Sequence, residues 1–213
     1  MGKVRLVCFD LDDTLIREIH SVMLPCILNG KEKEHSLIQQ QEEKGLLDYI
    51  SADYHRAELL SGLEEYKIAE SFLKIAKPLK SIKSVIKALH EQNIKCIVIT
   101  VGPKQVAKVV SDIWEFDYYY GSDYEVVEGI FTGKILNYIS AEQKISCLQS
   151  FCKNNSIKPE ECIAVGDGST DIPMFDYCGK SIDINSSSKV RKRAKYSVDT
   201  DDLADILKYI LSA

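Results

Sequence analysis

The sequence predicts an α/β fold in which a parallel β-sheet carries helices on both faces and a helical cap domain is inserted after the first strand. Four short apolar runs, rich in β-branched residues and too short for helices, are typical of buried parallel strands. They are residues 4–9, 96–100, 162–165 and, more weakly, 181–184. Helical patterns alternate with these runs, which indicates a sheet covered on both faces. Between the first strand and the next helix, residues 16–77 show no strand pattern.

The core helices are predicted from apolar residues that recur at helical spacing. The expected ranges are 82–92, 104–113, 142–154, 172–177 and 203–211. A further segment alternates and contains Gly129 and Gly133, so we expect a β-hairpin of residues 124–127 with 131–136. The tyrosines at 118–120 are more typical of strand and core packing than of a binding site.

Residues 16–77 are predicted to form the cap, because a βα connection normally takes only about 2–6 residues. Four helical patterns fill this segment, at residues 18–28, 34–47, 52–60 and 63–75. Asn29-Gly30 and Ser61-Gly62 are helix stops, and Pro78 ends the insertion. The core domain is therefore expected to comprise residues 1–15 and 78–213.

Composition argues against two classes of partner. The chain of 213 residues has a net charge of -5, whereas nucleic-acid and membrane-surface proteins carry excess Lys and Arg. The basic run of Arg191, Lys192, Arg193 and Lys195 is short and is better interpreted as a solvated face. No apolar stretch approaches the ~20 residues of a membrane span, and the chain enters its first strand without a leader. We expect a cytoplasmic protein, monomeric or weakly homodimeric, with no nucleic-acid or membrane partner.

Seven cysteines are scattered along the chain without a CxxC pair. Cys8, Cys96 and Cys162 lie in or beside apolar strand-like runs, where a thiol behaves as a small hydrophobe. Reduced, buried thiols are therefore expected in preference to disulfides or a zinc site.

Carboxylates follow the first predicted strand directly, as Asp10, Asp12 and Asp13, with Thr14 next to them. Ligands of open α/β sheets bind beyond the carboxyl ends of the strands. Carboxylates so close together repel one another, and a Mg²⁺ ion with its preference for oxygen ligands would relieve that repulsion. The alternative is that these residues cap the following helix.

Two other strands also end in candidate ligand-binding residues. The third strand leads into Gly166, Asp167, Gly168 and, three residues later, Asp171, which adds carboxylates at the same edge of the sheet. The alternative is an ordinary Gly-Asp-Gly turn.

The second strand ends at Thr100, followed by Val101 and Gly102 before a helix whose free amides suit a phosphate group. Here the alternative is helix capping by Thr100. Lys144 lies in the first turn of another helix, where it opposes the helix dipole unless a phosphate faces it. Alone, it would be one more surface lysine.

These four elements in this order resemble the haloacid dehalogenase superfamily of phosphohydrolases over nearly the whole chain. The family's Asp-x-Asp-x-Thr motif corresponds to residues 10–14, and its Gly-Asp-Gly-x-x-Asp motif to residues 166–171. The family's Ser or Thr falls on Thr100 and its lysine on Lys144. The resemblance implies a Rossmann-like core and an inserted helical cap.

The cap position resembles that of the phosphoserine phosphatase subgroup, with departures. The usual Ser-Gly-Gly is here Thr100-Val101-Gly102, and Thr170 stands where Asn is usual. The substrate-binding Glu of the subgroup aligns with Ile19, beside Glu18, and the carboxylate-binding Arg has a counterpart in Arg56. A first-turn helix acid is the alternative for Glu18, and a cap-packing arginine for Arg56. These departures leave the substrate open.

The resemblance implies roles for individual residues. Asp10 acts as the nucleophile, and Asp12 as the general acid and then base. Mg²⁺ is held by Asp10, the backbone carbonyl of Asp12, and Asp167. Thr100, Lys144 and the amides of Val101 and Gly102 hold the phosphoryl group. Thr14, Gly168 and Asp171 are supporting residues, Asp171 by orienting Lys144 or metal-bound water.

The expected function is a Mg²⁺-dependent phosphomonoester hydrolase that acts through an aspartyl phosphate on a small phosphorylated metabolite, with phosphoserine as one candidate. Two alternatives remain: a phosphotransferase that passes the phosphoryl group to an alcohol, and a non-catalytic binding protein on the same fold. The sequence does not identify the leaving group.

Overall fold

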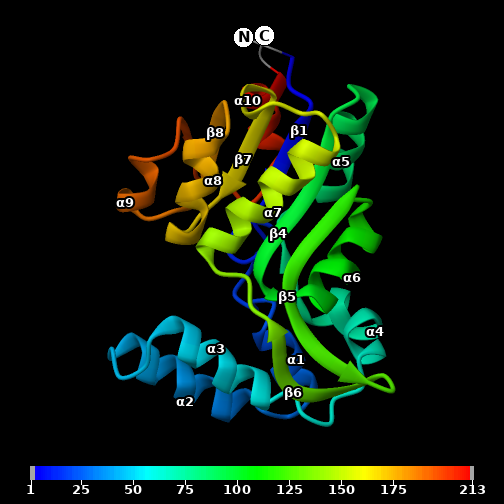
Figure 1. Cartoon of the computed structure of the whole chain (residues 1–213), viewed down its shortest axis with the longest axis vertical. Coiled ribbons are helices and arrows are strands. Elements are labelled where there is room, and N and C mark those ends of the chain that lie inside the picture. Colours follow the sequence, from blue (N-terminus) through cyan, green and yellow to red (C-terminus); the bar gives the residue numbers. More distant parts are fainter. Residues whose placement is uncertain (1–2, 212–213) are drawn as a thin grey trace.

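The computed structural model describes residues 3–211 of the chain (Figure 1). Its main feature is a seven-stranded sheet with the strand order β6-β5-β4-β1-β7-β8-β9. The strands are β1 (Leu6–Phe9), β4 (Lys95–Pro103), β5 (Tyr118–Val127), β6 (Ile130–Asn137), β7 (Cys162–Gly166), β8 (Lys180–Ile184) and β9 (Tyr196–Val198). The predicted α/β class with a mostly parallel sheet is confirmed. Strand β9 was not predicted, because three residues are too few to show a periodic pattern.

Strand β1 lies at the centre of the sheet, parallel to both of its neighbours. Phe9 is opposite Val98 of β4 on one side and Val165 of β7 on the other. The three strands therefore end at the same edge, as the sequence predicted. The backbone N–H of Asp10 continues the ladder by donating to the carbonyl of Val165 at 2.9 Å.

Alternate residues of β1 face opposite sides of the sheet, so each face has its own apolar core. Val7 and Phe9 belong to a core shared with α5 (Ile82–Glu91) and α6 (Lys104–Trp114). Leu6 and Cys8 belong to a core shared with α7 (Ala141–Asn154) and α8 (Ile172–Tyr177). All four helices lie within one or two residues of their predicted bounds.

The C-terminal part contains shorter elements. These are the 3₁₀ turns η1 (Pro159–Glu161), η2 (Ser169–Asp171) and η3 (Leu203–Ile206), and the helices α9 (Ser188–Arg191) and α10 (Leu207–Leu211). The helix predicted at 203–211 is thus a 3₁₀ turn that continues into α10.

Four helices fill the segment after β1, as predicted. They are α1 (Met23–Leu28), α2 (Glu32–Glu43), α3 (Tyr49–Glu58) and α4 (Tyr66–Ile75). The prediction that the first helix starts at Glu18 was wrong: Glu18 has a φ of +63°, a left-handed conformation that a helix excludes.

Two short strands frame this helical segment, and the sequence did not reveal them. β2 (Ile16–Arg17) pairs antiparallel with β3 (Lys77–Pro78), so that Ile16 is opposite Pro78. Two residues are too few to show a strand pattern. The pairing brings the two ends of the helical segment together next to the core.

The predicted hairpin is present but longer than expected. The first part of β5 pairs parallel with β4, and the second part pairs antiparallel with β6. Glu128 and Gly129, both with positive φ, form the turn. Gly62 N–H donates to the Phe131 carbonyl at 2.9 Å, and Glu65 N–H to the Gly129 carbonyl at 2.8 Å. The hairpin therefore extends from the core sheet to the helical segment, as Figure 1 shows.

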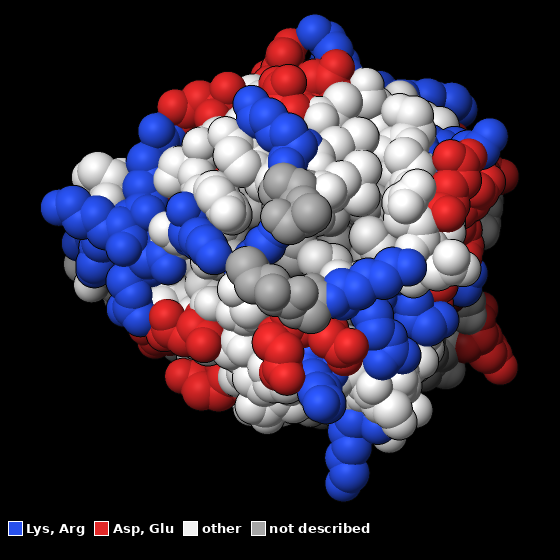
Figure 2. Space-filling view, turned by 90° about the horizontal axis from the view of Figure 1, so that it is seen from above, with Lys and Arg blue, Asp and Glu red and all other residues white. Residues whose placement is uncertain are grey.

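The surface carries charges of both signs (Figure 2), with Lys and Arg gathered at the edge where α9 lies. Within the basic run, Arg191 pairs with Asp199 and Arg193 with Asp176. All seven cysteines are free thiols, and five of them are buried. In the described part of the chain, no helix has the length and apolar character that a bilayer span requires.

Candidate active site

Asp10, directly after β1, is 6% exposed and lies against a buried lysine. The Nζ atom of Lys144, on α7, donates to Oδ1 of Asp10 at 2.5 Å and to Oδ1 of Asp171 at 2.6 Å. Lys144 itself is 0% exposed. Its aliphatic stem packs in the interior, and its charge is balanced by two carboxylates.

Asp171 is fixed from the other side by the backbone of the turn that follows β7. Its Oδ2 accepts the N–H of Asp167 at 3.1 Å and the N–H of Gly168 at 3.0 Å. A Cβ on Gly166 would overlap the Asp171 carboxylate, so this position requires glycine. The glycines of the motif thus serve to bring the carboxylate of Asp171 close to the backbone.

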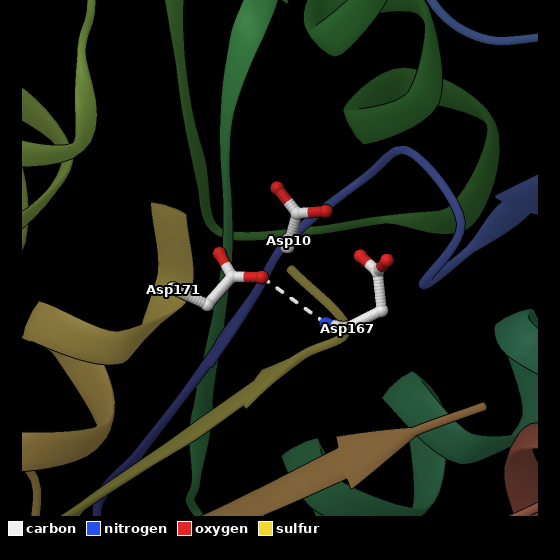
Figure 3. Close-up of side chains that lie close together, drawn as sticks. All are labelled: Asp10, Asp167 and Asp171. Carbon is white, nitrogen blue, oxygen red and sulfur yellow. Dashed lines mark hydrogen bonds between the residues drawn. The ribbon is translucent and has the colours of Figure 1, made fainter. Parts of the chain in front are cut away.

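The carboxylates of Asp10, Asp167 and Asp171 converge in space (Figure 3), with one oxygen of each within 4.8 Å of the others. Thr14 adds a further contact, because its hydroxyl donates to Oδ1 of Asp167 at 3.2 Å. The structure therefore brings together these three carboxylates, Thr14 and Lys144 from three segments: the one after β1, helix α7 and the turn after β7.

This crowding changes the acidity of the group. Burial, followed by the charge of Asp171, raises the pKa of Asp10 well above its usual value, although Lys144 opposes the shift. Burial, Asp171 and Asp13 raise the pKa of Asp167 to about 7. Burial alone would lower the pKa of Lys144, but Asp10 and Asp171 outweigh it and the pKa is raised. One lysine is too little positive charge for three carboxylates, so the group favours an added cation.

The carboxylate oxygens that accept no hydrogen bond are suitable ligands for a hard divalent cation. Among the described residues, Oδ2 of Asp10 and Oδ2 of Asp167 accept no hydrogen bond, whereas both oxygens of Asp171 are used. Two carboxylate oxygens leave room for the water and phosphate ligands that Mg²⁺ retains. The carboxylate of Asp12 is not one of the three that converge. The sequence prediction assigned metal binding to the backbone carbonyl of Asp12 and not to this carboxylate.

Asp12 instead faces the segment before α1. Its Oδ1 accepts the N–H of Ser21 at 2.5 Å, and its Oδ2 accepts the Ser21 hydroxyl at 2.6 Å. The hydroxyl of Thr100 donates to Oδ2 of Asp12 at 3.4 Å and accepts the N–H of Gly102 at 3.0 Å. A Cβ on Gly102 would overlap the Ser21 hydroxyl. The fully buried Ser21 was missed because a single serine before a helix carries no distinctive pattern.

A cavity of about 520 Å³ lies beside Asp12, between the helical segment and the core. The core contributes Val101, Gly102 and Tyr124, and the remaining lining residues are Asp12, His20, Ser21, Val22, His35, Gln39, Glu42, Glu43, Asp53 and Arg56. Its size is within the usual range for small-molecule sites.

Of the two residues predicted to contact the substrate, Arg56 lies at the cavity and Glu18 does not. Arg56 lines the cavity, and its guanidinium is bound to Glu42 and Asp53. Glu18 is exposed, and the residues that line the cavity do not include it. The left-handed backbone at Glu18 ends the two-residue strand β2 instead of starting a helix.

Comparisons with known proteins show which family the chain resembles. The model of the haloacid dehalogenase-like hydrolase family matches residues 7–176. The phosphoserine phosphatase of Saccharomyces cerevisiae is 29% identical over 97% of this chain and 67% of its own length. That of Idiomarina loihiensis is 29% identical over 95% of this chain and 91% of its own length.

Solved structures show the same fold. A phosphoserine phosphatase with an analogue of its phospho-aspartyl intermediate superposes with a TM-score of 0.82 and 26% identity, covering 98% of this chain and 100% of the other. A substrate-bound phosphoserine phosphatase has a TM-score of 0.83 and 26% identity, covering 99% of this chain and 100% of the other. Because the family match covers most of the chain and includes the converging carboxylates, this protein belongs to the haloacid dehalogenase-like hydrolase family.

Proposed function

We propose that the protein is a Mg²⁺-dependent phosphomonoester hydrolase that forms an aspartyl phosphate on Asp10 and acts on a small phosphorylated metabolite. The main support is the buried Asp10, whose Oδ1 accepts a hydrogen bond from Lys144. Among the described residues its Oδ2 accepts none, and the carboxylate lies close to that of Asp167. The names of the relatives suggest phosphoserine as the first substrate to test.

In this proposal, Mg²⁺ is held by Asp10, Asp167 and the backbone carbonyl of Asp12. When bound, the ion would neutralise charge on the phosphoryl oxygens and keep Asp10 ionised. Asp171 is a supporting residue, because its oxygens are occupied by Lys144 and by two backbone amides.

The chain's own residues carry the two half-reactions. A carboxylate oxygen of Asp10 attacks phosphorus, and the bond from phosphorus to the leaving oxygen breaks while Asp12 gives that oxygen a proton. Asp12 then takes a proton from water, which attacks phosphorus and releases Asp10 and inorganic phosphate. The phosphoryl oxygens would be held by the ammonium of Lys144, the hydroxyl of Thr100 and the amides of Val101 and Gly102. For this, Thr100 gives up its hydrogen bonds to Asp12 and to the N–H of Gly102 when the phosphoryl group binds.

Ser21 supports Asp12 in both steps. Two hydrogen bonds from one residue fix the Asp12 carboxylate, and that carboxylate lines the cavity where a leaving group would lie. Positioning of a general acid by such contacts is what efficient proton transfer requires.

Residues 16–77 act in this proposal as a cap domain, and residues 1–15 and 78–213 as the catalytic core. The paired strands β2 and β3 lie at the two crossings between them. The cap closes over the site, excludes water during the first half-reaction and contributes the walls that select the substrate. Free thiols are compatible with the cytoplasmic location that we propose.

Phosphate release from a panel of phosphorylated metabolites tests the function, with Mg²⁺ or with EDTA. We expect metal-dependent release by the wild type and loss of release by Asp10→Asn. Asp112→Asn, an exposed aspartate on α6, is the matched control. Release that persists in Asp10→Asn would rule out this nucleophile. Added alcohols distinguish the phosphotransferase alternative, because transfer would give new phosphate esters in place of inorganic phosphate.

A further inference from the structure

The cavity beside Asp12 has an unusual charge balance for a site that binds a doubly anionic phosphoester. Besides Asp12, three carboxylates line it: Glu42 and Glu43 of α2, and Asp53 of α3. Among its described lining residues, Arg56 is the one side chain with a permanent positive charge. The part of the cavity formed by α2 and α3 therefore carries a net negative charge.

Arg56 is already held at both ends of its guanidinium. Its Nη2 donates to Oε2 of Glu42 at 2.5 Å, and its Nη1 donates to Oδ1 of Asp53 at 2.9 Å. The side chain of Arg56 is only 10% exposed. The second oxygen of Asp53 accepts the hydroxyl of Tyr138 at 2.7 Å. The third nitrogen, Nε, has no hydrogen-bond partner among the described residues, but it is buried away from solvent. A ligand carboxylate would therefore have to move the atoms that cover Nε, or displace Glu42 or Asp53, to bind the guanidinium.

Neither histidine of the cavity places a positive charge beside α2 and α3. His20 directs its Nε2 to Asp13 at 3.0 Å. The hydrogen bond to Asp13 raises the pKa of His20, but the charge of this ring is paired with Asp13. His35 is 4% exposed, and its Nδ1 has no hydrogen-bond partner among residues 3–211. Burial and the nearby Arg56 lower the pKa of His35 to about 4, so this ring is neutral at neutral pH.

Carboxylate oxygens, by contrast, remain available on α2. Within the described chain, Oε1 of Glu42 accepts no hydrogen bond, and Glu43 accepts one bond, from the side-chain amide of Gln39 at 3.0 Å. An ammonium group has three N–H donors and is a direct match for two or three such acceptors. A ligand carboxylate in the same place would face like charge.

We propose that this cavity selects phosphomonoesters of amino alcohols that carry an ammonium group and lack a carboxylate, of which O-phosphoethanolamine is the simplest. This inference rests on the proposed function, because it places the phosphate at Asp10 and the ammonium at Glu42 and Glu43. A volume of about 520 Å³ accommodates larger amino alcohols as well.

Binding to the Asp10→Asn protein with Mg²⁺, measured by calorimetry, tests the preference without turnover. The ligands are O-phosphoethanolamine, O-phosphoserine, which adds a carboxylate, and phosphoglycolate, which has a carboxylate and no amine. We expect O-phosphoethanolamine to bind at least about tenfold more tightly than either of the others. The carboxylate of the other two ligands would face the carboxylates of the cavity, and such a like-charge contact lowers the affinity by more than about tenfold. Equal or tighter binding of O-phosphoserine would overturn the inference.

Two variants locate the effect. Glu42→Gln releases one end of Arg56, so the ratio of O-phosphoserine to O-phosphoethanolamine affinity should rise about tenfold. Glu43→Gln should weaken O-phosphoethanolamine and leave the phosphoglycolate affinity the same or higher. Glu32→Gln, an exposed residue of the same helix outside the cavity, is the matched control for folding and for net charge. Unchanged ratios in Glu42→Gln and Glu43→Gln would contradict the assignment of the ammonium to these carboxylates.

Hydrolysis of p-nitrophenyl phosphate by the wild type separates the two proposals. Its nitrophenyl group has neither an ammonium nor a carboxylate, so its turnover depends on the phosphoryl-transfer residues and not on ammonium recognition. Absence of this turnover with the binding preference intact would refute the proposed function alone. Turnover of p-nitrophenyl phosphate with no preference for O-phosphoethanolamine would refute the specificity alone.

Discussion

The ammonium of Lys144 lies 2.5 Å from Oδ1 of Asp10, although the two residues are 134 positions apart in the chain. Both are buried, and Asp171 completes a cluster of one positive and two negative side chains. A buried charge without its partner is strongly destabilising. The same contact places a cation where the phosphoryl group on Asp10 would lie, so stability and activity depend on one residue.

Replacing Lys144 by Met is therefore expected to affect both properties. The two carboxylates would lose their counter-ion, at a cost of about 3–5 kcal/mol in the free energy of unfolding. Phosphate release should fall by at least about 100-fold, because a donor to the phosphoryl group is lost. Urea unfolding and phosphate-release assays measure the two effects.

The double variant Lys144→Met/Asp171→Asn distinguishes the two roles. Removing one carboxylate relieves the repulsion, so part of the lost stability should return while activity stays low. Recovery of activity together with stability would show that Lys144 serves folding alone.

Ser21 should influence turnover through Asp12. Ser21→Ala removes the hydroxyl bond to Oδ2 but keeps the N–H bond to Oδ1. A hydrogen bond to a charged group contributes about 1.5–3 kcal/mol, which predicts a fall in kcat of about 10- to 100-fold. In the proposed mechanism Asp12 protonates the leaving group, so the loss should be larger for an alkyl phosphate than for p-nitrophenyl phosphate. Ser36→Ala, at an exposed site on α2, is the control, and equal losses for both substrates would argue against this role.

Tyr138 should help to keep the helical segment against the core. Its hydroxyl donates to Asp53 of α3 at 2.7 Å, and its ring stacks on Tyr54 of the same helix. In Tyr138→Phe the ring contact remains and the hydrogen bond is lost. We expect the free energy that holds α3 against the core to fall by about 1–3 kcal/mol. Limited proteolysis within residues 16–77 should then become faster than in Tyr66→Phe, which alters an exposed tyrosine of α4. Identical cleavage rates in the two variants would contradict this prediction.

His35 should make the protein less stable in mild acid. Its pKa is lowered from the ordinary 6.5 to about 4 in the folded protein, so the unfolded chain binds a proton more readily between these values. Stability from this group is fully present above pH 6.5 and is lost as the pH falls towards 4. At about 1.4 kcal/mol per unit, the loss between about pH 7.5 and pH 5 is about 2 kcal/mol.

Urea unfolding at the two pH values checks the contribution of His35. His35→Gln should show a pH dependence smaller by about 2 kcal/mol than the wild type. His55→Gln, which alters an exposed histidine of α3, should retain the wild-type pH dependence. A wild-type slope in His35→Gln would mean that other groups cause the acid sensitivity.

Much of the fold and part of the site could be predicted from local sequence patterns. The strands β1, β4 and β7 contain continuous apolar runs, and each run leads into a residue of the candidate site. Asp10 directly follows β1, Asp167 directly follows β7, and Thr100 lies near the end of β4, which continues to Pro103 beyond the predicted end at Thr100. Since parallel strands end at one edge of the sheet, the pattern was sufficient to bring these residues together. The four helices of residues 16–77 were likewise visible from their periodicity and their glycine stops.

The sequence by itself determined the long strands and helices and the edge of the sheet that carries the carboxylates. Only the tertiary structure decided that Ser21 holds Asp12, that Arg56 is bound by Glu42 and Asp53, and that the β5–β6 hairpin reaches the helical segment. The physical reason is the range of the interactions. Strand and helix patterns repeat every two or 3.6 residues, so they can be recognised within a short stretch of sequence. A hydrogen bond or ion pair between side chains far apart in the chain produces no such repeat around either residue.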